Sequence, residues 1–127
     1  MTKLVLIFLA GGAGSLARYL LCGWAQRQGT ESFPVGTLLV NVVGCLVIGF
    51  LTAAFSGRIM IREEYRIMIT IGFIGGFTTF STFGLETFTL LDDGQILRGM
   101  TNVVLSVGLG LVAVWFGYRI AQSWLGA

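Results

Sequence analysis

Four stretches of this chain are apolar for about 20 residues or more, the length that a helix needs to cross a bilayer. They cover residues 4–24, 34–55, 67–91 and 97–124. Inside a bilayer every backbone polar group needs a partner within the protein, so stretches of this length fold as helices. The sequence therefore predicts an all-α membrane protein with four transmembrane helices. We expect residues 1–127 to form a single domain, because the connections between the stretches are short.

The composition agrees with a membrane protein and argues against an enzyme. Of the 127 residues, 55% are hydrophobic and 11% are charged, whereas soluble domains carry about 25% charged residues. The chain has no histidine, which removes the commonest acid–base group and metal ligand. Cys22 and Cys45 lie in apolar runs without ligand spacing, so we interpret them as buried small side chains. The net charge of +2 is too small to indicate a nucleic-acid partner.

Four spans place both termini on one side of the membrane, and the basic residues orient the chain only weakly. Five basic residues fall on the terminal side and three on the other: Lys3, Arg58, Arg62, Arg66 and Arg119 against Arg18, Arg27 and Arg98. Orientation follows the lysine and arginine excess in short loops, so this bias admits insertion in both directions. Four helices hardly enclose a polar pathway by themselves. Glycines in several spans allow close helix approach, and we expect a homo-oligomer, most simply a dimer.

Polar side chains within the apolar runs are the first functional candidates. Arg18 either attracts an anion at a vestibule or extends to the lipid headgroups. Asn41 either lines a pore or forms a hydrogen bond between helices, and the same two interpretations apply to Asn102 and Ser106, which share one helix face. Glu86 is the only carboxylate well inside an apolar run. It either acts on a transported ion or pairs with threonine hydroxyls to hold helices together.

The segment GGFTTFSTFGLET, residues 75–87, is the most unusual part of the third span. Its two adjacent glycines weaken a helix, and its hydroxyls can satisfy freed backbone groups, so we predict that the third helix is broken in the middle. A break exposes carbonyls to a cation and an amide end to an anion. Phe77, Phe80 and Phe83 recur every third residue. Such a stripe is usually helix packing, but the electropositive edge of an aromatic ring also gives an anion weak attraction.

The chain resembles the Fluc (CrcB) family of fluoride channels along essentially its whole length. The resemblance rests on GGAGSLARY at 11–19, GTLLVNVVGC at 36–45 and GFIGGFTTFSTFGLET at 72–87. It implies an antiparallel, dual-topology homodimer with two separate fluoride pathways along the interface.

The resemblance also implies residue roles. The fluoride pathway would contain Asn41, Phe80, Ser81, Thr82, Phe83 and Glu86, and by position in the fourth span also Asn102 and Ser106. Arg18 would lie towards a vestibule. A structural sodium ion on the dimer axis would be held by the backbone carbonyls of Gly75 and Thr78 from both subunits.

The function implied is passive, selective export of fluoride across the plasma (inner) membrane, which relieves fluoride toxicity. The expected partners are fluoride, a second copy of the chain and membrane lipid. One alternative is a proton-coupled exporter of the small four-span multidrug class. Such exporters need a carboxylate in the first span, where this chain has Arg18 and no Asp or Glu. A second alternative is a structural subunit without transport, which leaves the polar groups of residues 75–87 without a purpose.

Overall fold

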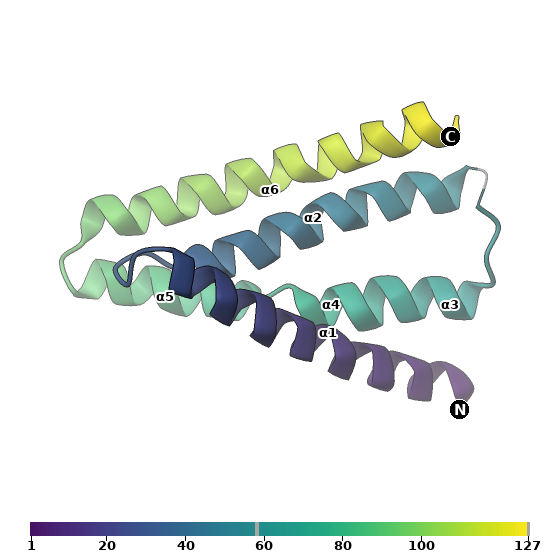
Figure 1. Cartoon of the computed structure of the whole chain (residues 1–127), viewed down its shortest axis with the longest axis horizontal. Coiled ribbons are helices and arrows are strands. Elements are labelled where there is room, and N and C mark those ends of the chain that lie inside the picture. The colour runs from purple at the N-terminus through teal and green to yellow at the C-terminus, as the bar shows by residue number, and fades with distance from the viewer. Residues whose placement is uncertain (58, 127) are drawn as a thin grey trace.

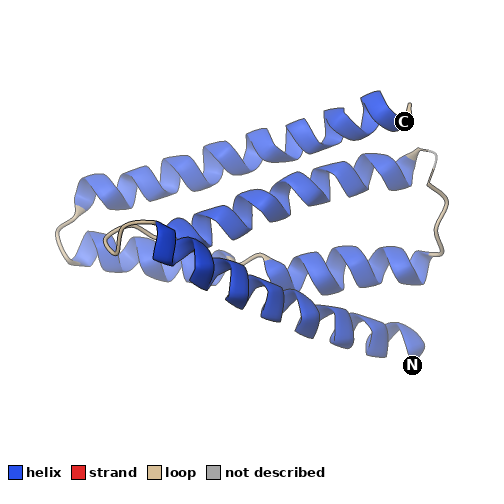
Figure 2. Cartoon of the chain, in the orientation of Figure 1, coloured by secondary structure: helices blue, strands red, loops and turns tan. Residues whose placement is uncertain are grey.

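The computed structural model describes residues 1–57 and 59–126, so Arg58, counted above among the basic residues, lies outside the described part. The described chain contains helices and loops but no strand (Figure 2). Four helical segments are long and apolar enough to cross a membrane: Thr2–Gln28, Val35–Ser56, Glu63–Asp92 and Ile96–Leu125. The predicted all-helical, four-span architecture is confirmed. The start of the first helix and the end of the last lie at the same end of the bundle (Figure 1).

The helix bounds follow from local chemistry. Helix α1 is Thr2–Gln28, and α2 is Val35–Ser56 with Pro34 as its N-cap. Between the third span and α6 (Ile96–Leu125) the chain reverses at Gly94, whose φ of +75° is accessible mainly to glycine. The amides of Gly94 and Gln95 donate to the carbonyls of Leu91 and Leu90, at 3.0 and 2.8 Å. This is the Schellman arrangement that closes a helix C-terminus.

The third span consists of several unequal parts. It contains α3 (Glu63–Ile67), the π-helix η1 (Met68–Ile74), α4 (Gly75–Phe77) and α5 (Phe80–Asp92). Two extended residues join α4 to α5: Thr78 has φ −86° and ψ 158°, and Thr79 has φ −150° and ψ 113°. The span is therefore bent at Thr78–Thr79, where the ribbon between α4 and α5 is drawn as a loop (Figure 1). We call these two residues the junction.

Close backbone contacts hold the helices in two pairs. Helix α2 lies along α6, while α1 crosses the third span obliquely at η1 and α4 (Figure 1). A Cβ atom at Gly49 would overlap the carbonyl of Val114, and one at Gly117 would overlap that of Leu46. Because neither glycine has a side chain, α2 and α6 approach backbone to backbone, as expected of small residues at helix interfaces in membranes.

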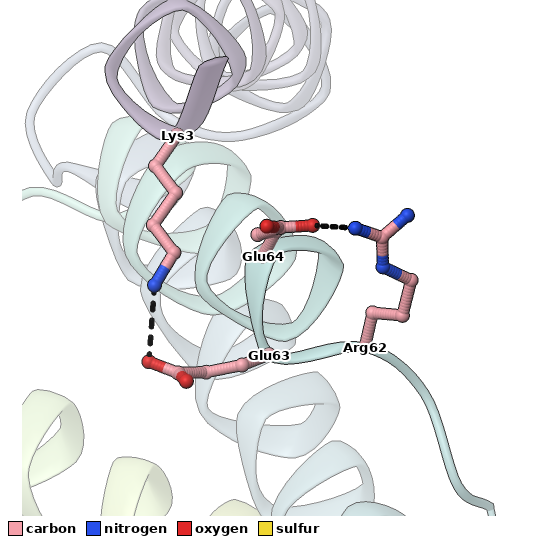
Figure 3. Close-up of polar contacts among 4 residues, drawn as sticks. All are labelled: Lys3, Arg62, Glu63 and Glu64. Carbon is pink, nitrogen blue, oxygen red and sulfur yellow. Dashed lines mark hydrogen bonds and ion pairs between the residues drawn. The ribbon is translucent and has the colours of Figure 1, made fainter. Parts of the chain in front are cut away.

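Many large apolar side chains point away from the bundle. Phe8 is 79% exposed, and Trp115 on α6 is 62% exposed. In water such a surface would aggregate, so it is suited to lipid or to another protein chain. The polar contacts at the terminal end agree with this placement. Lys3 reaches Glu63 at 3.4 Å and Arg62 reaches Glu64 at 2.8 Å, both at the surface (Figure 3).

Candidate functional site

The junction is stabilised first by its own threonines. The amide and the hydroxyl of Thr78 both donate to the Ile74 carbonyl, each at 3.0 Å. The Thr79 hydroxyl accepts a hydrogen bond from the Thr82 amide at 3.3 Å and donates to the Thr82 hydroxyl at 2.9 Å. Thr79 is thus the N-cap of α5, a position at which threonine satisfies an amide that lacks a helical partner. The sequence of two threonines therefore ends one helical part and begins the next.

Asn41 holds the junction from the side of α2. Its Nδ2 donates to the Thr79 carbonyl at 2.9 Å, and its Oδ1 accepts from the Thr79 amide at 2.8 Å. Both backbone groups of one extended residue are therefore bonded to a single side-chain amide. The pore-lining and helix-joining interpretations of Asn41 are compatible, because the same side chain also lines the cavity described below.

Arg18 contacts α4, just before the junction, from the side of α1. Its Nε donates to the carbonyl of Gly76 at 3.1 Å, and the Ser15 hydroxyl donates to the same oxygen at 3.4 Å. Arg18 is half-buried. The guanidinium is directed at the backbone of the third span, an arrangement that a side chain extended to the headgroups would not require.

Among the described residues, several carbonyls at the junction and in α4 just before it lack a hydrogen bond. Within the described part of the chain, no hydrogen bond reaches the carbonyl oxygen of Gly75 or that of Thr78. The neighbouring carbonyls of Ile74, Gly76 and Thr79 are all occupied. The carbonyl of Phe77 likewise receives no hydrogen bond in the described chain, and the assignment of a cation to Gly75 and Thr78 stays a prediction.

Phe80 and Phe83 lie beside these carbonyls, at the first turn of α5. Their ring centroids are 5.5 Å apart and their planes are tilted by 47°. Phe80 is 82% exposed. Both rings line a cavity of about 440 Å³, which we call the first cavity. It is also lined by Asn41, Gly75, Thr78, Thr79 and Ser106. The structure thus brings together candidate residues from α2, the junction, α5 and α6.

A second cavity, of about 560 Å³, lies on the α1 side of the junction. Its polar lining includes Ser15, Arg18, Thr37, Thr79 and Thr82. Thr79 lines both cavities, so both lie against the junction. Ser81, by contrast, is exposed and lines neither cavity.

Glu86 is bonded to α2 by Thr37. The Thr37 hydroxyl, which is buried, donates to Glu86 Oε1 at 2.6 Å. Glu86 Oε2 is also buried and has no hydrogen-bond partner within the described chain. Thr37 was not among the predicted site residues, although it lies four residues before Asn41 on the same helix face. That spacing was the available indication of its role.

Asn102 lies between two helices and lines neither cavity. It is 1% exposed, and its Nδ2 donates to the Thr87 hydroxyl at 2.9 Å. The Thr87 hydroxyl donates to the Phe83 carbonyl at 2.8 Å, and the Ser106 hydroxyl donates to Asn102 Oδ1 at 3.4 Å. Of the two interpretations of Asn102, this geometry favours the hydrogen bond between helices. Thr87 was not a predicted site residue.

Comparisons with known proteins agree with one family along nearly the whole chain. The sequence model of the family described as CrcB-like protein, Camphor Resistance (CrcB), matches residues 5–118. A fluoride-specific ion channel FluC of Geobacter sulfurreducens is 45% identical over 97% of this chain and 99% of its own. The protein of that name from Geobacter metallireducens is 47% identical, covering 96% and 98%. That from Phocaeicola vulgatus is 49% identical, covering 96% and 100%.

Proposed function

The chain belongs to the family of CrcB-like proteins, and we propose that it is a passive, selective channel that exports fluoride across the cell membrane. The similar proteins named above are ion channels and not enzymes. The structural observation that carries the proposal is the first cavity, in which Phe80 and Phe83 lie beside the junction. Export down an electrochemical gradient relieves fluoride toxicity without ATP or a coupled ion gradient. We assign the protein to the plasma (inner) membrane.

The first cavity is chemically suited to weak binding of a small anion. Within the described chain no charged side chain lines it, so an anion entering it meets ring edges, hydroxyls and amides. The edge of an aromatic ring is electropositive, and the Ser106 hydroxyl can replace part of a hydration shell. Conduction requires attraction strong enough for entry but loose enough for exit. A full positive charge at this position would hold the ion too tightly.

The other polar candidates would continue the path on the α1 side of the junction. Thr82 and Thr37 line the second cavity, and Thr37 connects to Glu86. Ser81 precedes Thr82 in the chain, its hydroxyl lies 3.4 Å from that of Thr79, and it is exposed and accessible to a partner. Asn102 would act through Ser106 and Thr87, to which it is bonded, without contacting the ion.

We propose that the channel is an antiparallel homodimer with dual topology and two pathways. Phe80 is 82% exposed in the single chain, and a cavity that is open on one side becomes a pathway when a second copy covers it. The weak bias of basic residues is compatible with insertion in both orientations. Close contact between the two junctions would then bring the free carbonyls of both copies together.

A structural sodium ion fits these carbonyls. Unwound backbone in membrane proteins coordinates sodium through carbonyl oxygens, and those of Gly75 and Thr78 have no hydrogen-bond partner in the described chain. An unsatisfied backbone group in hydrocarbon costs several kcal/mol. Sodium would therefore stabilise the junction and the pairing of the two copies.

The direct test is anion efflux from liposomes that contain the purified protein and sodium. Fluoride-selective and chloride-selective electrodes record release in parallel. We expect rapid fluoride release with little chloride release. Fluoride retention by liposomes with correctly assembled protein would refute the channel. Release that depends on a proton gradient would instead favour the proton-coupled exporter.

A further inference from the structure

The motif GGAGSLAR places four residues on one face of α1. Gly11, Gly14, Ser15 and Arg18 are separated by three, one and three residues, the spacing of a single helix face. This face meets the third span. A Cβ atom at Gly14 would overlap the carbonyl of Phe73, and one at Gly76 would overlap the Gly11 carbonyl. The glycines therefore bring the α1 backbone close enough for the two polar residues to reach the carbonyl of Gly76.

The Gly76 carbonyl needs this contact because the junction removes its helical partner. In a continuous helix it would accept from the amide four residues later, but α4 ends at Phe77. It accepts instead from Arg18 Nε at 3.1 Å and from the Ser15 hydroxyl at 3.4 Å.

We propose that Arg18 is a positioning residue that fixes the end of α4 through its Nε. This positioning is its main contribution to conduction. Attraction of the anion by the charge of Arg18 contributes less. Asn41 fixes Thr79 from the opposite side. With both contacts, the junction is held between α1 and α2, and the start of α5 with Phe80 is held with it. As a statement about conduction, the proposal rests on the proposed channel function.

Side-chain geometry separates the two roles of Arg18. The donor is Nε, the fourth atom beyond Cα. In Arg18→Gln an amide nitrogen occupies the same place along the side chain, so the donor stays and the charge is lost. In Arg18→Lys a methylene occupies that place, so the charge stays and the donor moves one atom outward. Arg18→Met has a methyl group there and loses both, which makes it the matched control for Arg18→Gln.

The first experiment measures fluoride efflux for these three variants against the native protein in liposomes. We expect Arg18→Gln to conduct faster than Arg18→Lys and Arg18→Met, with a difference of about tenfold, the factor set by one hydrogen bond to a charged or polar group. Ser15→Ala, which removes the longer contact, should have a smaller effect than Arg18→Met. Conduction by Arg18→Lys that equals or exceeds that of Arg18→Gln would overturn the proposal.

The second experiment does not depend on flux. Hydrogen–deuterium exchange of the detergent-solubilised protein reports on the amides of residues 74–84. Faster exchange of this segment in Arg18→Met and Arg18→Lys than in Arg18→Gln would support the proposal. Equal exchange in all three variants would overturn it.

If only Arg18→Gln folds, the donor is the essential group, and if only Arg18→Lys folds, the proposal fails. Absence of efflux from the native protein would refute the channel, while the exchange result would still test the contact.

Discussion

Phe80 combines high exposure with a place in the lining of the first cavity. It is 82% exposed in the chain, so its replacement removes little packing within one copy. Phe83, whose ring centroid is 5.5 Å away, lines the same cavity. If the two rings supply electropositive edges to fluoride, an aliphatic side chain of similar volume should preserve the fold and lose the attraction.

We therefore expect Phe80→Ile and Phe83→Ile to lower fluoride efflux by about tenfold or more, the effect of losing one or more weak attractive contacts. The matched control is Phe88→Ile, because Phe88 lies on the same helix, is 64% exposed and lines neither cavity. Size-exclusion chromatography verifies assembly of each variant. Unchanged efflux from well-assembled Phe80 and Phe83 variants would show that the rings only pack.

Asn41 offers a second test at the residue scale. Asn41→Asp keeps the acceptor for the Thr79 amide but loses the donor to the Thr79 carbonyl and sets two oxygens against each other. We expect fluoride efflux to fall and the unfolding temperature of the detergent-solubilised protein to drop, since an unsatisfied buried group costs about 1–3 kcal/mol. Thr37→Ser, which keeps its hydroxyl on the same face of α2, serves as a control. An unchanged unfolding temperature for Asn41→Asp would contradict the role in holding the junction.

At the scale of helices, α5 and α6 are joined by the hydrogen bond from Asn102 to Thr87. Both side chains are buried, and the Thr87 hydroxyl in turn donates a hydrogen bond to the Phe83 carbonyl. A double-mutant cycle with Asn102→Leu and Thr87→Val should give a coupling free energy of unfolding of about 0.6 kcal/mol and no more than about 1.7, the average and the maximum for hydrogen bonds between membrane helices. Urea or heat unfolding in detergent measures it. Additive effects of the two substitutions would mean that the bond does not form in the membrane protein.

The helices also show how far a sequence can be interpreted. Apolar windows predicted four spans because length and hydropathy alone decide whether a helix crosses a membrane. The third span begins at Glu63, before the predicted 67, since a helix can continue into the headgroup region with polar residues. The π-helix Met68–Ile74 was not predicted, because hydropathy and residue spacing do not distinguish it from an α-helix.

The same limit applies to the polar residues of the site. Spacing along a helix places Asn102 and Ser106 on one face but does not say which neighbour the face meets. Ser106 lines the first cavity, and Asn102 points to Thr87. The partner of Arg18 is likewise a backbone carbonyl, which has no residue type to recognise in a sequence.

At the scale of the whole molecule, the arrangement of basic residues should govern function through orientation. The terminal end of the bundle can be made more basic with Ser56→Lys and Ser123→Lys, and the opposite end with Gln28→Lys and Asp92→Lys. All four positions are exposed. By the positive-inside rule each pair of substitutions should drive the chain into one orientation, as reporters fused to the C-terminus would record on either side of the membrane.

If the active form is an antiparallel pair, a cell that contains only one orientation cannot assemble it. We therefore expect each charge-biased variant alone to leave fluoride-sensitive cells unprotected and the two variants together to restore protection. The matched control is the unbiased chain, which should place its C-terminus on both sides and protect alone. Full protection by either biased variant alone would mean that parallel copies conduct, and the exposed surface at Phe80 would then be covered by a different contact.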